Sequence, residues 1–287
     1  MKKIIIIGSK GMAGHVMYQY FKRHATPFEV VDISRDNDFF TSNYTADATD
    51  LERLKAIFHA EKPDFVINCI GVLNKDAEDN PDKAIFLNSY FPHFLAREGI
   101  KNDFKLIHIS TDCVFNGKKG KYTEGSVKDG FGVYAQSKAL GEVDYGQHLT
   151  VRTSIIGPEL KAHGIGLFDW FMQQKGIIKG YRNVIWSGVT TVELAKAVDK
   201  MLQQNITGLY HLVNNPINKF DLLGVFKAVF RKKDVEITVF DDYYSDKSLI
   251  NTRRDFDYAV SDYSIMVQEM SDWINNYPTF YGKYIID

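Results

Sequence analysis

The chain is poor in several features that mark other classes of protein. It has two cysteines and seven prolines among 287 residues, and no repeat, low-complexity tract or proline-rich linker. Its apolar runs, such as residues 4–7, are far too short to span a bilayer, and the N-terminal run is too short for a signal segment. Lys and Arg (35) balance Asp and Glu (36). We therefore expect neither a nucleic-acid nor a membrane partner, and a reduced cytoplasmic setting rather than a disulfide framework.

Apolar strand patterns alternate with helical patterns through residue 153. The predicted strands cover residues 2–7, 28–33, 64–68, 104–109 and 150–153, and helices are predicted after the first strand and over residues 51–59 and 81–97. Strands that alternate with helices indicate βαβ units and a parallel sheet with right-handed crossovers. Such sheets bind ligands outside the carboxyl ends of their strands.

A glycine turn follows the first predicted strand. Gly8, Gly11 and Gly14 stand between that strand and a helix, the context in which such a turn binds a dinucleotide. The first glycine permits the tight turn, the second lets backbone amides approach a pyrophosphate, and the third lets the helix pack on the strand. The spacing is G-x-x-G-x-x-G, one residue away from the strict fingerprint.

The second predicted strand leaves the choice of dinucleotide open. Asp32 stands near its end, about 20 residues past the glycines, where a carboxylate favours the ribose 2′-hydroxyl of NADH. Arg35 follows three residues later and could bind the 2′-phosphate of NADPH instead. Two further positions suit the cofactor: Gly71, after the third strand, permits close backbone approach. Asn88 interrupts an apolar helix stripe, where asparagine needs a partner, and we expect it to brace the site.

The segment from Ile107 to Glu142 carries the chemistry. Thr111 stands at the carboxyl edge of the strand that is predicted to end at Ile109. Tyr134 and Lys138 are four residues apart and so share one face of a predicted helix. A nearby ammonium favours the phenolate and lowers the tyrosine pKa. A hydroxyl from the strand end can bind the same substrate oxygen, so the three side chains form a proton donor and acceptor for a carbonyl/alcohol pair.

Beyond residue 157 the pattern is irregular. Helices are predicted over residues 167–174, 192–203, 220–231 and 263–273, a strand over 208–213, and a basic stretch over 175–186. Arg182, Arg253 and Arg254 could clamp a diphosphate bidentately. We expect residues 1–156 to form a Rossmann-type, doubly wound NAD(P)-binding domain to which residues 183–213 return. Residues 157–182 and 214–287 are expected to form a smaller, mixed substrate-binding region.

Taken in order, four motifs resemble the extended short-chain dehydrogenase/reductases, and most closely the dTDP-4-dehydrorhamnose reductase branch. The motifs are the glycine turn, Asn68-Cys-Ile-Gly71, Ser110-Thr111-Asp112-x-Val-Phe, and Tyr134-Ala-Gln-Ser-Lys138-x-x-Gly-Glu142. The resemblance implies reduction of the C4 keto group of a nucleotide-linked 4-keto-6-deoxyhexose by NADPH or NADH, in surface polysaccharide biosynthesis. Thr111 would orient the carbonyl, Tyr134 would protonate its oxygen, and Lys138 would hold the nicotinamide ribose. It also implies a homodimer.

The residue patterns and the resemblance together give two sets of candidate site residues. The cofactor set is Gly8, Lys10, Gly11, Met12, Asp32, Arg35, Asp47, Cys69, Gly71, Asn88, Tyr134 and Lys138, with no metal. The substrate set is Thr111, Asp112, Cys113, Ile155, Arg182, Trp186 and Arg253.

The chain departs from the branch at two positions. Cys113 stands where the branch usually has tyrosine, and Ile155 stands where it commonly has tryptophan. A UDP-linked N-acetylated sugar is therefore a candidate substrate. Related dehydratases carry glutamate at the position of Cys113, and a thiol is a poor general acid, so dehydration is disfavoured. A 4-epimerase stays open, as does a non-catalytic subunit like the regulatory subunit of methionine adenosyltransferase, which resembles the same branch.

Overall fold

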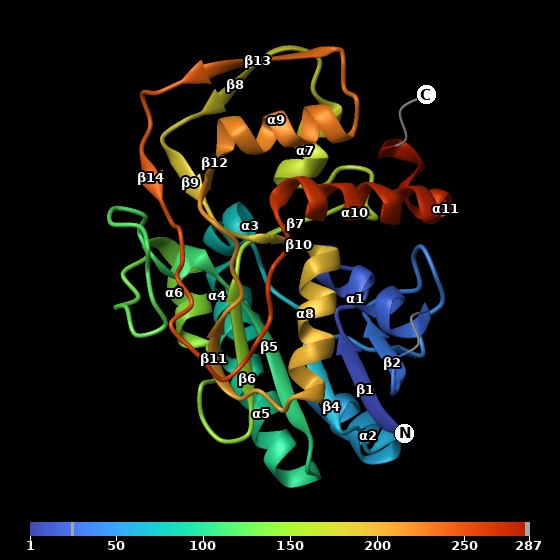
Figure 1. Cartoon of the computed structure of the whole chain (residues 1–287). Coiled ribbons are helices and arrows are strands. Elements are labelled where there is room, and N and C mark those ends of the chain that lie inside the picture. The colour runs from blue at the N-terminus through green and yellow to red at the C-terminus, as the bar shows by residue number, and fades with distance from the viewer. Residues whose placement is uncertain (24–25, 285–287) are drawn as a thin grey trace.

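Seven parallel strands form the main sheet of the computed structural model, which describes residues 1–23 and 26–284 (Figure 1). Their order is β11-β6-β5-β4-β1-β2-β3. The strands are β1 (Lys2–Ile7), β2 (Phe28–Ser34), β3 (Tyr44–Thr45), β4 (Phe65–Asn68), β5 (Lys105–Thr111), β6 (Leu149–Thr153) and β11 (Gly208–His211). The chain runs outward from β1 through β2 and β3 and then returns to β4 on the other side of β1. The predicted Rossmann-type sheet is confirmed, and the switch point between β1 and β4 is where such sheets bind ligands.

Helices cover both faces of this sheet because alternate residues of a strand point to opposite faces. On β1, Ile4 and Ile6 join a core with α1 (Met12–Arg23) and α8 (Thr191–Gln203). Ile5 and Ile7 join a second core with α2 (Leu51–Glu61) and α5 (Phe91–Asn102). All four isoleucines are buried, which accounts for the continuous apolar run of a strand covered on both sides.

The segment predicted as one helix over residues 81–97 has a π-helical turn inside it. The helix α4 (Pro81–Ala84) runs into the π-helical segment η1 (Ile85–Tyr90), which continues as α5. The short α3 (Asn74–Asp79) precedes them, and α6 (Gly132–Leu140), which carries Tyr134 and Lys138, packs against η1. A π-helical turn is wider than an α-turn and often occurs at functional sites.

The second half of the chain, as far as residue 284, adds three small sheets that the sequence did not predict. The pairs are β7 (Ile155–Ile156) with β10 (Val189–Thr190), and β8 (Gly176–Tyr181) with β13 (Val235–Phe240). A third sheet joins β9 (Val184–Trp186) to β12 (Ile217–Asn218) and β14 (Ser245–Asp246). The basic stretch predicted over residues 175–186 thus contains two strands, β8 and β9, which belong to different sheets.

Three helices close the small region: α7 (Leu167–Gln173), α9 (Lys219–Val229) and α10 (Tyr263–Asn276), with α11 (Pro278–Tyr281) after them. Their apolar side chains form a core of their own, which also takes in Val16 of α1 and Val192 of α8. Of the range 183–213, α8 and β11 lie with the main sheet, whereas β9 belongs to the small region. The division of the chain into a cofactor-binding and a substrate-binding region stays a prediction.

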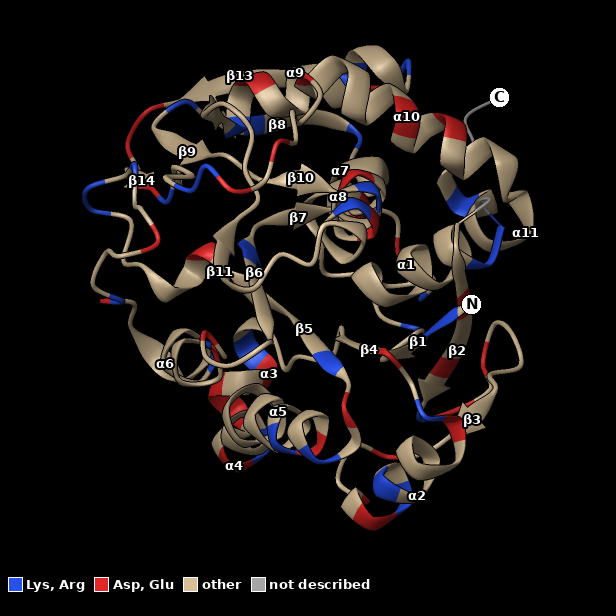
Figure 2. Ribbon diagram, turned by 60° about the horizontal axis from the view of Figure 1, so that its bottom comes forward, with Lys and Arg blue, Asp and Glu red and all other residues tan. Residues whose placement is uncertain are grey.

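Charge is mixed along the ribbon. Red and blue segments occur together on α2 and α5 (Figure 2), consistent with the near-zero net charge of the chain. Within the described part of the chain, no helix is long and apolar enough to cross a membrane.

Candidate active site

Two grooves meet at the carboxyl edge of the main sheet. One has a volume of about 370 Å³ and is lined by residues that include Thr111, Tyr134 and Lys138. The other, of about 330 Å³, extends past the end of β2. Both are lined by Gly11, Cys69, Ile70 and Gly71. The two grooves therefore adjoin each other at the switch point of the sheet.

The glycine turn has the geometry that its residues predicted. Gly8 has φ +86°, and a Cβ there would lie 2.8 Å from Ile70 Cγ1. A Cβ on Gly14 would lie 2.1 Å from the Gly8 carbonyl oxygen, so only glycine lets α1 approach β1. Gly11 lies at the junction of the two grooves, where an open backbone could meet a pyrophosphate at the start of α1. This turn therefore fits a dinucleotide.

Asp32 is turned away from both grooves. It lies inside β2, fully buried, and its carboxylate accepts hydrogen bonds from Ser9 Oγ (2.6 Å) and from the Asn43 backbone N–H (2.8 Å). It holds the glycine turn and the loop after β2 instead of facing a ribose. Arg35 lines the second groove, is exposed, and has no carboxylate within ion-pair distance among residues 1–23 and 26–284.

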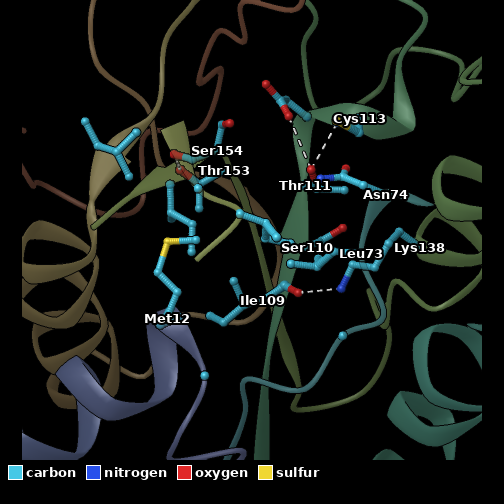
Figure 3. Close-up of a pocket in the computed structure, with 18 of the residues that line it drawn as sticks. Met12, Leu73, Asn74, Ile109, Ser110, Thr111, Cys113, Lys138, Thr153 and Ser154 are labelled. Carbon is cyan, nitrogen blue, oxygen red and sulfur yellow. Dashed lines mark hydrogen bonds between the residues drawn. The ribbon is translucent and has the colours of Figure 1, made fainter. Parts of the chain in front are cut away.

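Three other residues of the predicted cofactor set line the grooves, and two of them have polar groups that are bonded within the protein. Lys10 lines the second groove, but its Nζ donates to the carbonyls of Asp38 and Phe40 at 2.5 Å each and so ties down the loop after β2. Asp47 lines that groove too, with its carboxylate bonded by Thr49. Met12 lies across the first groove from Lys138 (Figure 3).

Asn88 braces the site from the π-helical turn. It is fully buried, its Oδ1 accepts from the Val72 N–H (2.8 Å), and its Nδ2 donates to the Val72 carbonyl (2.9 Å) and to Ser137 Oγ (3.0 Å). It therefore ties the loop after β4 to α6, the helix of Tyr134 and Lys138. It lines neither groove, so its part is structural support rather than direct contact.

Thr111, Tyr134 and Lys138 come together at the first groove. Lys138 Nζ donates to the Ile109 carbonyl at 2.8 Å, as Figure 3 shows. Thr111 Oγ1 accepts from the Cys113 N–H at 3.1 Å. The carboxylate of Glu78, on α3, accepts from the backbone N–H groups of Val133 and Tyr134 and so caps the first turn of α6.

Burial controls the acidity of both α6 side chains. It raises the pKa of Tyr134 above its ordinary value, the nearby Cys113 raises it further, and a hydrogen bond with Thr111 opposes the rise. Burial also lowers the pKa of Lys138 to about 8. The expectation that Lys138 depresses the pKa of the tyrosine is wrong for the free protein, because the Lys138 amine points to Ile109 and burial dominates.

Five residues of the predicted substrate set line the first groove: Thr111, Asp112, Cys113, Ile155 and Trp186. The Cys113 thiol receives a contact from Lys247 Nζ at 3.5 Å, and burial raises its pKa to about 11. The thiol is therefore neutral at physiological pH and, since the thiolate is the reactive form, a weak nucleophile.

The two arginines of that set lie elsewhere. Arg182 is exposed at the end of β8 and faces Asp241 at 3.8 Å. Arg253 pairs with Asp255 and donates to the carbonyls of Thr207 and Leu209, at the amino end of β11. That end is opposite to the edge that holds the grooves. Arg253 therefore fastens the start of a strand and is no part of the site.

Lys219 is the groove cation that sequence reasoning missed. It is the first residue of α9, lines the first groove, and its Nζ lies 4.8 Å from the centre of the Trp186 ring. Burial lowers its pKa to about 8, while Asp112 and Cys113 oppose that shift. No carboxylate in the described part of the chain forms an ion pair with it. The asparagine before a predicted helix marks the start of α9, but nothing in the pattern places that start at the groove.

A buried ion pair supports the floor of the site. Arg152 on β6 donates to both carboxylate oxygens of Glu142, at 2.8 and 2.6 Å, and Ser110 Oγ donates to the same carboxylate. Arg152 also contacts His211 Nε2 at 2.8 Å. The network links the ends of β5, β6 and β11, next to Thr111.

Comparison with known proteins gives consistent relatives. A family model described as the RmlD substrate binding domain matches residues 1–242. The spore coat polysaccharide biosynthesis protein SpsK of Bacillus subtilis is 27% identical over 225 residues, which cover 76% of this chain and 75% of SpsK. The methionine adenosyltransferase 2 subunit beta of Xenopus tropicalis is 30% identical over 142 residues, 49% of this chain and 42% of that protein.

A solved structure is similar over nearly the whole chain. The dTDP-4-dehydrorhamnose reductase of Bacillus anthracis, in complex with NADP, superposes with a TM-score of 0.80 and covers 95% of this chain and 99% of its own. At 18% identity this likeness shows the fold.

Proposed function

Because this chain belongs to the RmlD substrate-binding-domain family, whose members are mostly NAD(P)-dependent reductases, we propose that it reduces a nucleotide-linked sugar. The reaction is reduction of the C4 keto group of a nucleotide-linked 4-keto-6-deoxyhexose, in the biosynthesis of a surface polysaccharide. The observation that carries this proposal is the convergence of Thr111, Tyr134 and Lys138 in the first groove, which adjoins the second groove at Gly11 and Gly71.

The raised pKa of Tyr134 suits a proton donor. A phenol that burial keeps protonated can give its proton to the carbonyl oxygen as that oxygen gains negative charge. Thr111, at the end of β5, orients the carbonyl by a hydrogen bond from its hydroxyl. A bound reduced nicotinamide supplies the hydride. Lys138 binds the adjoining ribose, since it lines the first groove beside Tyr134.

The first groove suits a phosphorylated sugar. Lys219 and Lys247 lie around Asp112 and Cys113, and both lower the pKa of the buried Asp112 carboxyl against the effect of burial. We assign the diphosphate of the substrate to Lys219, in place of the two arginines that lie elsewhere. Cys113 is smaller than tyrosine and leaves room for an N-acetyl group, which favours a UDP-linked N-acetylated sugar.

The second groove favours NADPH over NADH. Asp32 is the residue that would select NADH, but its carboxylate already accepts hydrogen bonds from Ser9 and Asn43. Arg35 and Lys161 line the groove instead, and both are cations with exposed side chains. A 2′-phosphate binds a guanidinium through charge-assisted hydrogen bonds.

The test is oxidation of NADPH or NADH, followed by absorbance, with UDP- and dTDP-linked 4-keto-6-deoxy sugars made in situ by dehydratases. Oxidation that depends on one of these sugars supports the proposal and identifies the base and the cofactor. Folded protein that binds NADPH but oxidises none with any sugar contradicts it.

The match to a methionine adenosyltransferase subunit motivates one alternative, a role as a subunit of another enzyme. In that case the chain would bind cofactor, stay silent with every sugar and co-purify with an enzyme whose kinetics it changes. An epimerase would instead retain NAD tightly through purification. Burial raises the pKa of the Cys113 thiol to about 11, which makes it a poor general acid for a dehydratase.

A further inference from the structure

A buried histidine lies directly behind Lys138, and the mechanism above does not use it. His108 is on β5, fully buried. Its Nε2 is 3.4 Å from Lys138 Nζ, and its Nδ1 is 3.2 Å from Asn68 Nδ2. The ring thus connects the end of β4 to the amine of Lys138.

The backbone fixes the direction of these hydrogen bonds. The Ile70 N–H donates to Asn68 Oδ1 at 3.1 Å. With its oxygen held there, the Asn68 amide presents its NH₂ to His108 Nδ1, which must then accept. Burial lowers the pKa of His108 well below its ordinary value, so the ring is neutral. A neutral ring that accepts at Nδ1 carries its proton on Nε2.

That proton faces Lys138. An ammonium has three donors and no acceptor, so it cannot receive the Nε2–H of His108, whereas a neutral amine can. A neutral Lys138 would accept from His108, donate to the Ile109 carbonyl at 2.8 Å and keep one N–H for the groove. If Lys138 were charged, the Nε2–H of His108 and an N–H of the ammonium would face each other, and neither could accept. The network therefore favours the neutral amine.

We propose that His108 is a positioning residue for Lys138: its Nε2–H donates to the lysine amine, aims that amine at the groove, and weakens its hold on its proton. The inference rests on the proposed reduction. With a pKa of about 8, Lys138 starts the step mainly as the ammonium at neutral pH. After Tyr134 has given its proton to the substrate oxygen, the phenolate takes a proton from that ammonium. His108 then stabilises the neutral amine that results, until the amine regains a proton from solvent. No proton is gained or lost overall beyond the one that the alcohol keeps.

Other groups around Lys138 oppose the effect of His108 on the protonation of the lysine amine. Glu142, just after α6, and Cys69, after β4, both favour the ammonium, while burial disfavours it. His93 is the further group that acts on His108. Tyr134 lies one helical turn away on α6. His108, a neutral hydrogen-bond donor, thus favours the uncharged form of Lys138, as burial does.

The first test reads the tautomer of His108 in the free protein, without any turnover. Long-range ¹H–¹⁵N correlation spectra of ¹⁵N-histidine-labelled protein distinguish the two ring nitrogens, and the His108→Gln variant identifies the signal. We expect the proton on Nε2. A proton on Nδ1 would overturn the proposal whatever the enzyme reduces, and it would leave the proposed function untouched.

The second test reverses the network. In Asn68→Asp, one carboxylate oxygen still accepts from Ile70 and the other requires a proton on His108 Nδ1, so Nε2 becomes an acceptor for the ammonium. We expect the basic limb of the kcat–pH profile to move up by at least about one pH unit, a tenfold rise in proton affinity. The added negative charge also contributes to this shift, so its contribution has to be measured apart from that of the His108 ring.

The double variant Asn68→Asp/His108→Leu separates the two contributions, because it keeps the charge and removes the ring. We expect a clearly smaller shift relative to His108→Leu than Asn68→Asp causes in the wild-type background. Equal shifts would refute a role for His108. His148→Leu removes another fully buried histidine, at the opposite end of the sheet, and should leave the limb in place. Should these variants fail to fold, the tautomer of the wild-type protein still decides.

Discussion

Tyr134 shows at the level of one residue how burial overrides a sequence rule. Tyrosine and lysine one helical turn apart predict an acidic phenol, yet burial raises the pKa of Tyr134 and the Lys138 amine turns to the Ile109 carbonyl. The distances between polar atoms, which spacing along a helix does not fix, decide the outcome. For a reductase the protonated phenol is the useful form.

Tyr134→Phe removes this proton donor and little else. Turnover should fall by about 10²-fold or more, since positioned acid catalysis typically contributes that much. Affinity for NADPH should stay nearly unchanged, because Lys138 and the glycine turn remain. Steady-state kinetics and cofactor titration measure the two quantities. Wild-type turnover in the variant would mean that another group protonates the carbonyl oxygen.

Arg35 is the residue on which we expect cofactor choice to depend. Arg35→Ala should raise the KM for NADPH by about 10- to 100-fold, the range that a hydrogen bond to a charged group contributes. The KM for NADH should change little, since NADH lacks the 2′-phosphate. Arg53→Ala is the matched control, an exposed arginine on α2 outside both grooves. Parallel losses with both cofactors would contradict a 2′-phosphate contact.

At the scale of secondary-structure elements, the sequence predicted the long, buried strands of the main sheet. The strands β1, β2, β4, β5 and β6 are mostly buried, and their carboxyl ends place Gly8, Gly71 and Thr111 at one edge. Asp50 and Thr190 stand immediately before α2 and α8, a position at which such residues cap helices, and each side chain accepts a hydrogen bond from a backbone N–H three residues on.

The small region was not readable in the same way. Its strands have two to six residues and pair with partners far along the chain, as β8 does with β13. Hydrophobic periodicity carries no information on such pairings. The same limit explains why Arg253 was predicted at the groove and Lys219 was not. The packing of α9 and β11, which the sequence pattern does not show, places Lys219 at the groove and Arg253 away from it.

Helix α1 contains a histidine that makes the fold sensitive to acid. His15 is fully buried, its Nδ1–H donates to the Gly11 carbonyl at 2.7 Å, and Nε2 has no partner in the described part of the chain. Burial lowers its pKa to about 4. Between pH 6.5 and 4 the unfolded chain therefore binds more protons than the native one, and stability falls as the pH falls.

His15→Asn tests this sensitivity, since the asparagine amide can keep the bond to Gly11 without titrating. Between pH 7 and pH 5 the wild-type protein should lose about 2 kcal/mol more unfolding free energy than the variant, from a pKa near 4 against 6.5. Guanidinium unfolding at the two pH values measures the difference. The other buried histidines, including His211, titrate equally in both proteins. Equal losses would show that His15 is already protonated or exposed.

At the scale of the whole molecule, an apolar surface indicates how two chains could pair. Ile85 (56% exposed), Tyr90 (43%), Leu140 (69%) and Tyr145 (45%) lie on η1, on α6 and just after it. His93 on α5 joins these elements, through the Leu140 carbonyl and the Tyr145 hydroxyl at 2.8 Å each. Figure 1 shows α4 and α6 together at one side of the main sheet.

We expect this face to form a homodimer interface, because large exposed apolar side chains grouped on one face mark protein–protein contacts. Light scattering after size exclusion should give the mass of two chains for the wild-type protein and of one for Ile85→Lys/Leu140→Lys, since two facing ammonium groups would repel across a two-fold axis. Ile177→Lys is the matched control, because Ile177 is 71% exposed but lies on β8 in the small region. A dimer that survives the double change yet dissociates in the control would move the interface to the small region. It would also separate pairing from the active site, since α6, the helix of Tyr134 and Lys138, would then have no neighbour across the dimer axis.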